Sequence, residues 1–473
     1  MTPDEFRTAG HELIDTIADY LDGVGDRRIV PDIAPGDVYA ALPATAPADT
    51  VDFATLMADI ERTVLPNLAH WQHPGWFAYF PANTSYASIL AELLSAGVGV
   101  QGMSWVTSPA ATEVETLMCD WMTDLLGLPA AFRSDSPTGG GVIQGSASEA
   151  TLVSILSARW RATGGQVNTD GDTTRLVAYR TSQAHSSIDK GLRIAGIGED
   201  NIRTVAHDAS LAMDVADLER QITADRAQGL QPFFVCSTHG TTSTLAMDPT
   251  PAIADALARC GSGDDQPSIW LHVDGAMAGI AALDSEQRWV NNGLDRADSY
   301  CTNPHKWMGV NFDCTLYWTT DRHSLLGALS ILPAYLRSAA ADSGAIDYRD
   351  WQIPLGRRFR ALKLLFVLRL DGVEPIISML RTHCTLADTL AARITDHPRL
   401  DLAAPTQLGL VCIRHVDGNA ATDALIDTVN ATGKYLVTRT EVDGTSILRV
   451  SIGARTTTAE HVDALWATLI NAA

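Results

Sequence analysis

Between about residues 140 and 320, short apolar runs typical of β-strands alternate with longer segments of helical character. The strand-like runs lie at 142–144, 176–180, 202–206, 232–237, 269–273, 299–302 and 314–319. Strands that alternate with helices in this way form a mainly parallel sheet with helices packed over it. The pattern therefore predicts an α/β fold with a mainly parallel seven-stranded sheet in a large domain.

The two ends of the chain depart from this central pattern. Thr2 is placed to cap a helix, with Pro3 at the first helical position and Glu5 closing a capping box. Residues 30–50 hold four prolines and no periodic pattern, which predicts an extended arm of the kind that wraps a neighbouring subunit.

Beyond about residue 381 the pattern becomes mixed, with strand-like runs at 408–415, 435–441 and 446–452 between helices. This favours a smaller C-terminal α+β domain. We therefore expect three parts, namely an N-terminal helical arm and dimerisation segment over 1–85, a large domain over 86–380 and a small domain over 381–473.

Composition excludes several classes of partner. Lys plus Arg is 34 and Asp plus Glu is 56, and the resulting net charge of −22 repels nucleic acid and anionic membranes. The sequence has no run of eighteen apolar residues, and it does not open with a basic region followed by an apolar one. We therefore expect neither a membrane span nor secretion. The seven cysteines are scattered without a CxxC, which favours free thiols in a reducing cytoplasm and no metal site.

Two charged residues follow neighbouring strand-like runs. Asp274 directly follows the run at 268–273, and Lys306 follows the run that ends at Cys301. A buried lysine can carry an aldehyde as a Schiff base, and a carboxylate can keep a pyridine nitrogen protonated, so the pair suggests a pyridoxal phosphate (PLP) enzyme. Taken alone, Lys306 fits a surface lysine after an Asn-Pro turn and Asp274 a strand-end carboxylate.

Other polar residues follow the remaining runs. The segment 139–151 predicts a glycine turn, a strand and a helix start whose amides and serines suit a phosphate, although Ser146 or Ser148 could simply cap the helix. No Lys-Ser or Lys-Thr follows the glycines, which excludes a nucleoside triphosphate loop. His185 follows the run at 176–180, where it fits either a ring that stacks on a cofactor or an ordinary polar loop.

Several ordered motifs resemble those of the group II PLP decarboxylases, specifically the aromatic L-amino acid decarboxylase family. They are GVIQGSASEAT, QAHSS, HVDGAMAG, NPHKW, NFDC and DYRDWQIPLGRRFRALK, with the stretches HPGWFAYFPANTSY and SWVTSPAATEVE. The resemblance runs nearly end to end. It implies a fold-type-I PLP enzyme that is a homodimer with its active site at the subunit interface.

The resemblance also implies roles for single residues. Lys306 would be the Schiff-base lysine, Asp274 the partner of the pyridine nitrogen and His185 the stacking base. The phosphate would be held by Ser146, Ala147, Ser148 and Asn303, with Thr242 and Ala276 near the ring. The substrate pocket would be lined by Trp71, Tyr79, Phe80 and Pro81, by His305, and by Gln101 and Met103 from the partner subunit. Tyr335 matches a loop tyrosine that, in the family, is credited with protonating the substrate carbon after CO2 leaves.

We therefore expect PLP-dependent decarboxylation of an aromatic L-amino acid to the arylalkylamine and CO2, with tryptophan, tyrosine, phenylalanine, 5-hydroxytryptophan and Dopa all open. An aldehyde synthase is the alternative, but such relatives commonly replace the loop tyrosine or the stacking histidine, and Tyr335 and His185 are both present. A third alternative is a non-catalytic relative that only binds a cofactor or partner proteins. The presence of Lys306, Asp274, His185 and Tyr335 argues against it. The aromatic cluster at 71–80 by itself fits a core or subunit interface as well as a substrate wall.

Overall fold

The computed structural model describes residues 1–171, 175–260, 268–331 and 344–473. By compactness the chain divides into two units. The large unit comprises Ala82–Asp388 and Ala404–Val411, and the small unit comprises Met1–Pro81, Thr389–Ala403 and Cys412–Ala473. The three-part division with boundaries after residues 85 and 380 stays a prediction.

The large unit is built on a seven-stranded sheet with the order β1-β7-β6-β5-β4-β2-β3. Its strands are β1 (Gly140–Gln144), β2 (Leu176–Thr181), β3 (Ile202–Val205), β4 (Gln231–Thr238), β5 (Trp270–Asp274), β6 (Ser299–Thr302) and β7 (Thr315–Thr319). Because β7 is antiparallel to both of its neighbours, β1 and β6, the other six strands run in the same direction. The predicted mainly parallel sheet and all of its strands are confirmed.

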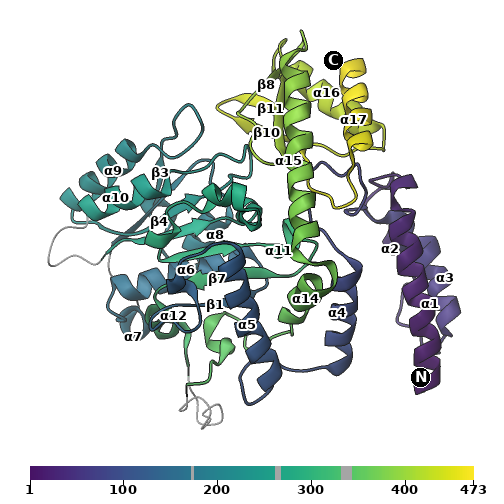
Figure 1. Ribbon diagram of the computed structural model, residues 1–473, viewed down its shortest axis with the longest axis horizontal. Helices are drawn as coiled ribbons and strands as arrows, with labels where there is room; N and C mark the ends of the chain where they lie inside the picture. Colours follow the sequence, from purple (N-terminus) through teal and green to yellow (C-terminus); the bar gives the residue numbers. More distant parts are fainter. Residues whose placement is uncertain (172–174, 261–267, 332–343) are drawn as a thin grey trace. The chain divides into compact units, whose positions relative to one another are not determined.

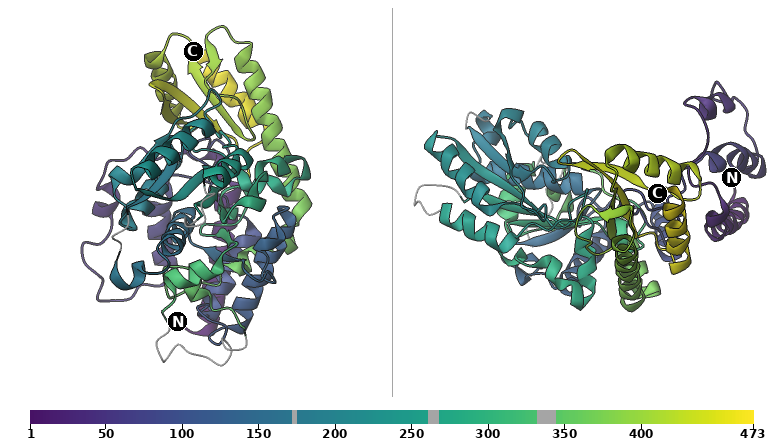
Figure 2. Two further views of the ribbon diagram at one scale, coloured as in Figure 1. Left: turned by 90° about the vertical axis from the view of Figure 1, so that its left-hand side faces the viewer. Right: turned by 90° about the horizontal axis from the view of Figure 1, so that it is seen from above.

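Helices cover both faces of this sheet (Figure 1), and Figure 2 shows the same layers from two further directions. Val177 and Tyr179 of β2 pack in a core with α9 (Val215–Ala227) and α10 (Thr250–Cys260). Leu176 and Ala178 point to the opposite face and pack with α6 (Ala147–Ala162) and α8 (Ser187–Ile194). Successive side chains of a strand alternate between faces, so a strand covered on both sides is apolar throughout, as these runs are.

Side-chain caps explain where several helices of the large unit begin. Ser85 caps α4 (Tyr86–Val98), Ser108 caps α5 (Pro109–Leu125) before a proline, and Asp321 caps α12 (Arg322–Leu329). Each of these side chains accepts a hydrogen bond from a backbone N–H of the first turn. Two further helices are α14 (Ala361–Phe366) and α15 (Val373–Thr395), and α15 continues into the small unit.

The small unit begins with α1 (Pro3–Asp22), whose predicted capping box is confirmed. Glu5 N donates to Thr2 Oγ1 at 3.2 Å, and Thr2 N donates to Glu5 Oε2 at 2.6 Å. The segment 30–50 is not extended throughout, because a short helix, α2 (Asp37–Ala41), follows Gly36 at φ 104°. A glycine tolerates this left-handed conformation, and that permits the turn into the helix.

The small unit also contains a four-stranded sheet with the order β10-β11-β9-β8. The three predicted strands are present as β9 (Leu410–His415), β10 (Thr438–Val442) and β11 (Thr445–Ser451). A fourth, β8 (Leu400–Leu402), is only three residues long and gave no periodic signal. Helices α16 (Asn419–Ala431) and α17 (Ala459–Ala472) pack beside this sheet.

Within the described ranges, no helix combines the length and the apolar character that crossing a bilayer requires. All seven cysteines are free thiols.

Candidate active site

The polar residues singled out in the sequence follow strands whose carboxyl ends lie along one edge of the large sheet. Ser146 follows β1, His185 follows β2, and Thr242 lies in an exposed turn after β4. Asp274 is the last residue of β5, and Lys306 follows β6. Ligands of open parallel sheets bind at this edge, so the topology brings these residues to one place.

Backbone pairing of β5 with β6 places Asp274 next to the segment that carries Lys306. Asp274 is the register partner of Cys301, and Gly275 N donates to Cys301 O at 2.9 Å. Asn303 N then donates to Ala276 O at 3.0 Å. Asp274 is only 5% exposed, and its Oδ1 accepts a hydrogen bond from Ala276 N at 2.9 Å. The carboxylate is therefore fixed at the end of its strand.

Lys306 lies on a single helical turn, α11 (Pro304–Trp307), that starts at Asn303. The side chain is half-buried, so it is not the surface lysine that an isolated Asn-Pro turn suggests. Asn83 Nδ2 donates to Lys306 O at 2.8 Å. On the next residue, Trp307 Nε1 donates to His383 Nδ1 at 2.9 Å, and the two rings stack. The turn is thus held on both sides of the lysine.

His185 interacts electrostatically with both Asp274 and Lys306. The ring lies at the surface of the large unit, and partial desolvation by packed neighbours lowers its pKa; the charge of Asp274 opposes this shift and that of Lys306 adds to it. Its Nδ1 accepts from Ser187 N at 3.1 Å and lies 2.8 Å from Ser187 Oγ. Because a backbone N–H can only donate, the neutral ring carries its hydrogen on Nε2.

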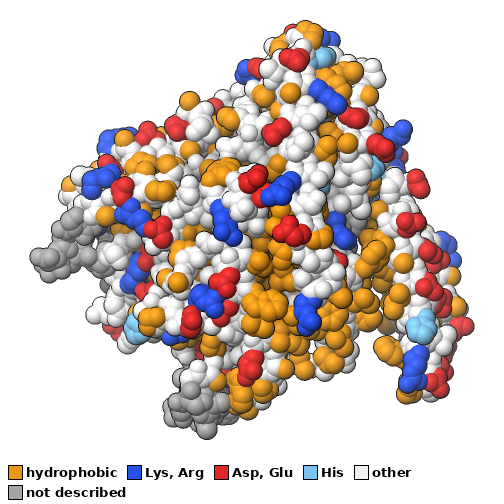
Figure 3. All heavy atoms as spheres, in the orientation of Figure 1, with side chains coloured by type: hydrophobic (Ala, Val, Ile, Leu, Met, Phe, Trp, Pro, Cys, Tyr) orange, Lys and Arg blue, Asp and Glu red, His pale blue; other side chains and the backbone are white. Residues whose placement is uncertain are grey.

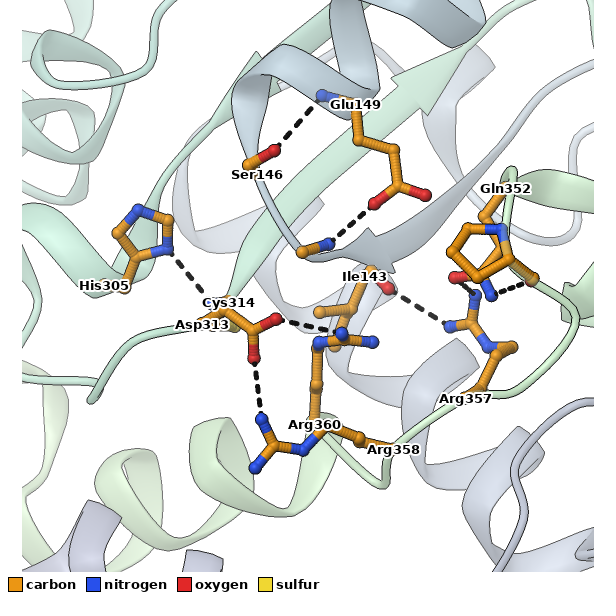
Figure 4. A network of polar contacts seen from close by, with 12 residues as sticks. Ile143, Ser146, Glu149, His305, Asp313, Cys314, Gln352, Arg357, Arg358 and Arg360 are labelled. Atoms are coloured by element: carbon orange, nitrogen blue, oxygen red, sulfur yellow. Dashed lines mark hydrogen bonds and ion pairs between the residues drawn. The ribbon is translucent and has the colours of Figure 1, made fainter. Parts of the chain in front are cut away.

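His305 is a second neutral imidazole next to Lys306. It is 5% exposed, and burial, followed by the charge of Lys306, lowers its pKa to about 4. Its Nδ1 accepts from Cys314 N at 3.0 Å, and its ring meets the Phe312 ring edge-on at 4.9 Å. Figure 4 shows the imidazole directed at the backbone of Cys314.

The turn from β1 into α6 offers free hydrogen-bond donors. Ser146 is the N-cap of α6, and its Oγ accepts from Glu149 N at 3.2 Å. Glu149 Oε2 in turn accepts from Gly145 N at 3.1 Å (Figure 4), and its Oε1 accepts from Ile353 N at 3.3 Å, so this carboxylate joins the turn before α6 to the segment around Ile353. The amides of Ala147 and Ser148, the first two residues of α6, have no partner within the helix and suit an anion.

Asn303 directly follows β6 and is a further candidate for binding the phosphate. Asn303 is 3% exposed, and its Oδ1 accepts from Thr315 Oγ1 at 2.9 Å, which fixes the direction of the side-chain amide. A helix start with Ser146, Ala147 and Ser148, together with this amide, has the chemistry of a phosphate site. With a carboxylate, a half-buried lysine and a neutral imidazole at the same sheet edge, the donor set fits PLP.

A network of charged residues packs against the end of β1 (Figure 4). The sequence interpretation gave these residues no role. Arg357 donates to Ile143 O at 3.1 Å and to Gln352 Oε1 at 2.7 Å, and it forms an ion pair with Glu115. Glu115 Oε1 also accepts from Ile143 N at 2.8 Å. Both partners of this ion pair are almost fully buried.

A second ion pair, between Asp313 and Arg360, has an O–N distance of 2.9 Å. The four charged residues Glu115, Asp313, Arg357 and Arg360 all lie within motifs that carry the family resemblance. Nothing in the sequence indicated which charge pairs with which, because the partners are far apart along the chain.

The aromatic residues expected at the substrate lie in the small unit. The rings of Trp71 and Tyr79 stack with centroids 5.8 Å apart, and Trp71 and Trp76 are 4.3 Å apart. Phe80 packs on the guanidinium of Arg449, with 5.1 Å between that group and the ring centroid. The next residue, Pro81, lies against Gly453. That Trp71, Tyr79, Phe80 and Pro81 line the substrate pocket stays a prediction.

Gln101 and Met103 lie in the large unit, beside the segment that contains the charged network. Gln101 Oε1 accepts from Arg357 N at 2.8 Å, and Met103 O accepts from Arg349 N at 2.9 Å. Their contact with a partner's substrate stays a prediction. Tyr335 lies outside the described residues.

Comparison with known proteins agrees with this geometry. A family model described as the pyridoxal-dependent decarboxylase conserved domain matches residues 35–416. Aromatic-L-amino-acid decarboxylase from Bos taurus is 40% identical over 474 residues, which cover 98% of this chain and 95% of the relative. Phenylacetaldehyde synthase from Arabidopsis thaliana is 41% identical over 479 residues, which cover 98% and 95%.

Among solved structures, that of Oryza sativa TDC with PLP and tryptamine superposes with a TM-score of 0.95 at 35% identity. The match covers 100% of this chain and 98% of that one. Fold, site chemistry and similarity over nearly the whole length thus agree, and the chain belongs to the family of pyridoxal-dependent decarboxylases.

Proposed function

We propose that the protein decarboxylates aromatic L-amino acids to the corresponding arylalkylamines and CO2. The observation that carries the proposal is the meeting of Asp274, Lys306 and His185 at the carboxyl edge of the sheet, in a chain of this family. Tryptophan, tyrosine, phenylalanine, Dopa and 5-hydroxytryptophan are the candidate substrates.

Each residue has a distinct task in this reaction. The residues that would hold PLP are Lys306 through its amine, Asp274 at the ring nitrogen, Ser146, Ala147, Ser148 and Asn303 at the phosphate, and His185, Thr242 and Ala276 beside the ring. When bound, the cofactor supplies an electron sink for the bond that releases CO2. Asp274 contributes a fixed negative charge, because the Ala276 amide and the end of β5 hold its carboxylate in place.

The two imidazoles are suited to positioning groups without adding positive charge. The pKa of His305 is lowered to about 4 by burial, so near neutral pH the ring is uncharged and presents an Nε2 hydrogen. His185 also presents Nε2, with its other nitrogen occupied by Ser187. Both rings lie near Lys306, and because they are uncharged they do not repel its ammonium group.

The preference for aromatic substrates is supported by the stacked rings of Trp71 and Tyr79, which form a flat apolar wall on the small unit. Flat walls of this kind suit an aromatic side chain. Relatives over nearly the full length are named as decarboxylases of aromatic L-amino acids and of tryptophan. We infer that these rings, with Phe80, Pro81, His305, Gln101 and Met103, determine the choice of substrate.

Aldehyde formation is the second candidate, because one relative is named as a phenylacetaldehyde synthase and a similar structure as a 4-hydroxyphenylacetaldehyde synthase. Retention of His185 and Tyr335 favours the amine. Replacing Tyr335 with Phe removes the proposed proton donor, so it should shift the product from amine toward aldehyde.

We also propose a homodimer. Helix α4 carries Leu90, Leu93, Leu94 and Val98 on one face, and each is between 44% and 54% exposed in the single chain. Figure 3 shows apolar side chains gathered over this part of the large unit. Spacings of three and four residues place these side chains together, and an apolar patch of this kind is typical of a subunit interface. The free thiols favour a reducing, cytoplasmic location.

The test is product analysis with purified protein and added PLP. The five aromatic amino acids and glutamate are supplied separately, and amine, aldehyde, O2 consumption and peroxide are measured. We expect amine in a one-to-one ratio with CO2 from at least one aromatic substrate and none from glutamate. Release of amine from glutamate alone would refute the aromatic assignment, and aldehyde with peroxide would establish the second candidate.

A further inference from the structure

A buried chain of polar groups leads from the interior of the large unit to Asp274. Trp270 Nε1 donates to Ser299 Oγ at 2.8 Å, and Ser299 Oγ lies 2.9 Å from His272 Nδ1. His272 Nε2 lies 4.0 Å from Cys301 Sγ, and Cys301 Sγ lies 3.8 Å from Asp274 Oδ1. Trp270, His272, Ser299 and Cys301 are completely buried, so water does not compete for these contacts.

The far end of this chain begins with a fixed donor. An indole N–H can only donate, so Ser299 Oγ accepts from Trp270 and is left with one hydrogen of its own. Two acceptors lie within reach of that hydrogen, His272 Nδ1 at 2.9 Å and Ser154 Oγ at 3.1 Å. Ser154 Oγ also lies 2.9 Å from Ala150 O, to which it donates, and 3.2 Å from His272 Nδ1.

Burial lowers the pKa of His272 to about 4, so this ring is uncharged near neutral pH, and its Nε2 lies 4.0 Å from the Cys301 sulfur. Burial likewise raises the pKa of the Cys301 thiol well above its ordinary value, so the sulfur keeps its hydrogen. The protonated thiol donates to Asp274 Oδ1, 3.8 Å from the sulfur.

We propose that Cys301 is a positioning residue: its thiol, packed beside His272, donates to Oδ1 of Asp274 and keeps that carboxylate in one orientation. The inference rests on the role of Asp274 in the proposed function. The Ala276 amide binds the same oxygen, so two donors act on Oδ1 and together restrict rotation of the carboxylate. A carboxylate held in one orientation would meet the cofactor's ring nitrogen in a fixed geometry, which would favour the protonated form of that nitrogen.

The experiment measures the protonation state of that nitrogen directly. Wild-type protein and variants are loaded with PLP that carries an NMR-active isotope at the ring nitrogen, and the chemical shift and the PLP dissociation constant are recorded. In Cys301→Ala we expect the shift to move toward that of a neutral pyridine and the affinity to fall by roughly threefold to tenfold. In Cys301→Ser, whose hydroxyl still donates, both should stay near wild type.

The matched control is Cys412→Ala. Cys412 is another buried thiol, and it lies on β9 of the small unit rather than on a strand beside Asp274. This variant should leave the chemical shift and the dissociation constant unchanged. Wild-type values in Cys301→Ala, or equal changes in Cys412→Ala, would overturn the proposal. If Cys301→Ala does not fold, Cys301→Val, which fills the space without a donor, provides the same comparison.

Asp274→Asn distinguishes a wrong role for Asp274 from a wrong role for Cys301. If it leaves the nitrogen shift unchanged, the role given to Asp274 in the proposed function is wrong. If it changes the shift while Cys301→Ala does not, only the role of Cys301 is wrong.

Discussion

Acidification from pH 7 to pH 5 should destabilise this protein through four buried histidines, His239, His272, His305 and His383. They are at most 5% exposed, and desolvation by burial lowers the pKa of each from 6.5 to about 4. A histidine with a lowered pKa in the folded state stabilises the fold above its unfolded pKa. That contribution is lost as the pH falls from 6.5 toward 4.

The magnitude follows from these values. Between about pH 7 and pH 5, the proton-linkage relation gives a loss of roughly 1.8 kcal/mol for each histidine, or about 7 kcal/mol for the four together. A loss of that size is comparable with the whole free energy of unfolding of many domains. The protein should therefore tolerate neutral pH well and unfold steeply as the pH approaches 5.

The decisive variant is His383→Gln, because the amide oxygen of Gln can still accept from Trp307 while the titrating group is removed. Urea unfolding of the PLP-loaded protein, followed by tryptophan fluorescence at several pH values, gives the pH dependence of the free energy of unfolding. The variant should lose about 1.8 kcal/mol less than wild type over this interval. The exposed neighbour Thr382→Ala is the control and should keep the wild-type slope. An unchanged slope in His383→Gln would refute the reasoning.

Three further predictions concern the lysine, the charged network and the dimer. Lys306→Ala should lose the visible absorbance of covalently held PLP, and persistence of that band after gel filtration would remove Lys306 from its role. Arg357→Met leaves the Glu115 carboxylate buried without its partner and should cost about 3–5 kcal/mol by urea unfolding, whereas Arg358→Met, at a side chain 59% exposed, should cost under about 1 kcal/mol. Leu94→Glu should convert a dimer into a monomer in sedimentation velocity, and a variant that stays dimeric would place the interface elsewhere.

Local chemistry accounts for what could be predicted from the sequence. The strands of the large sheet were identifiable because burial on both faces requires continuous apolar runs, and the start of α1 because Thr2 and Glu5 satisfy backbone groups within one turn. Short elements such as β8 and α2 carry too few residues to establish a period. The motif order was sufficient to indicate the family and its cofactor.

Tertiary structure decided which of these residues act on one another. Strand order brings Cys301 beside Asp274, and only there does an ordinary buried thiol become a donor to the carboxylate. The pairing of Glu115 with Arg357 across 242 residues is likewise invisible in the sequence. The physical reason is that propensities and caps depend on near neighbours in the chain, whereas a hydrogen bond or ion pair depends on distance in space, which the packing of the whole fold determines.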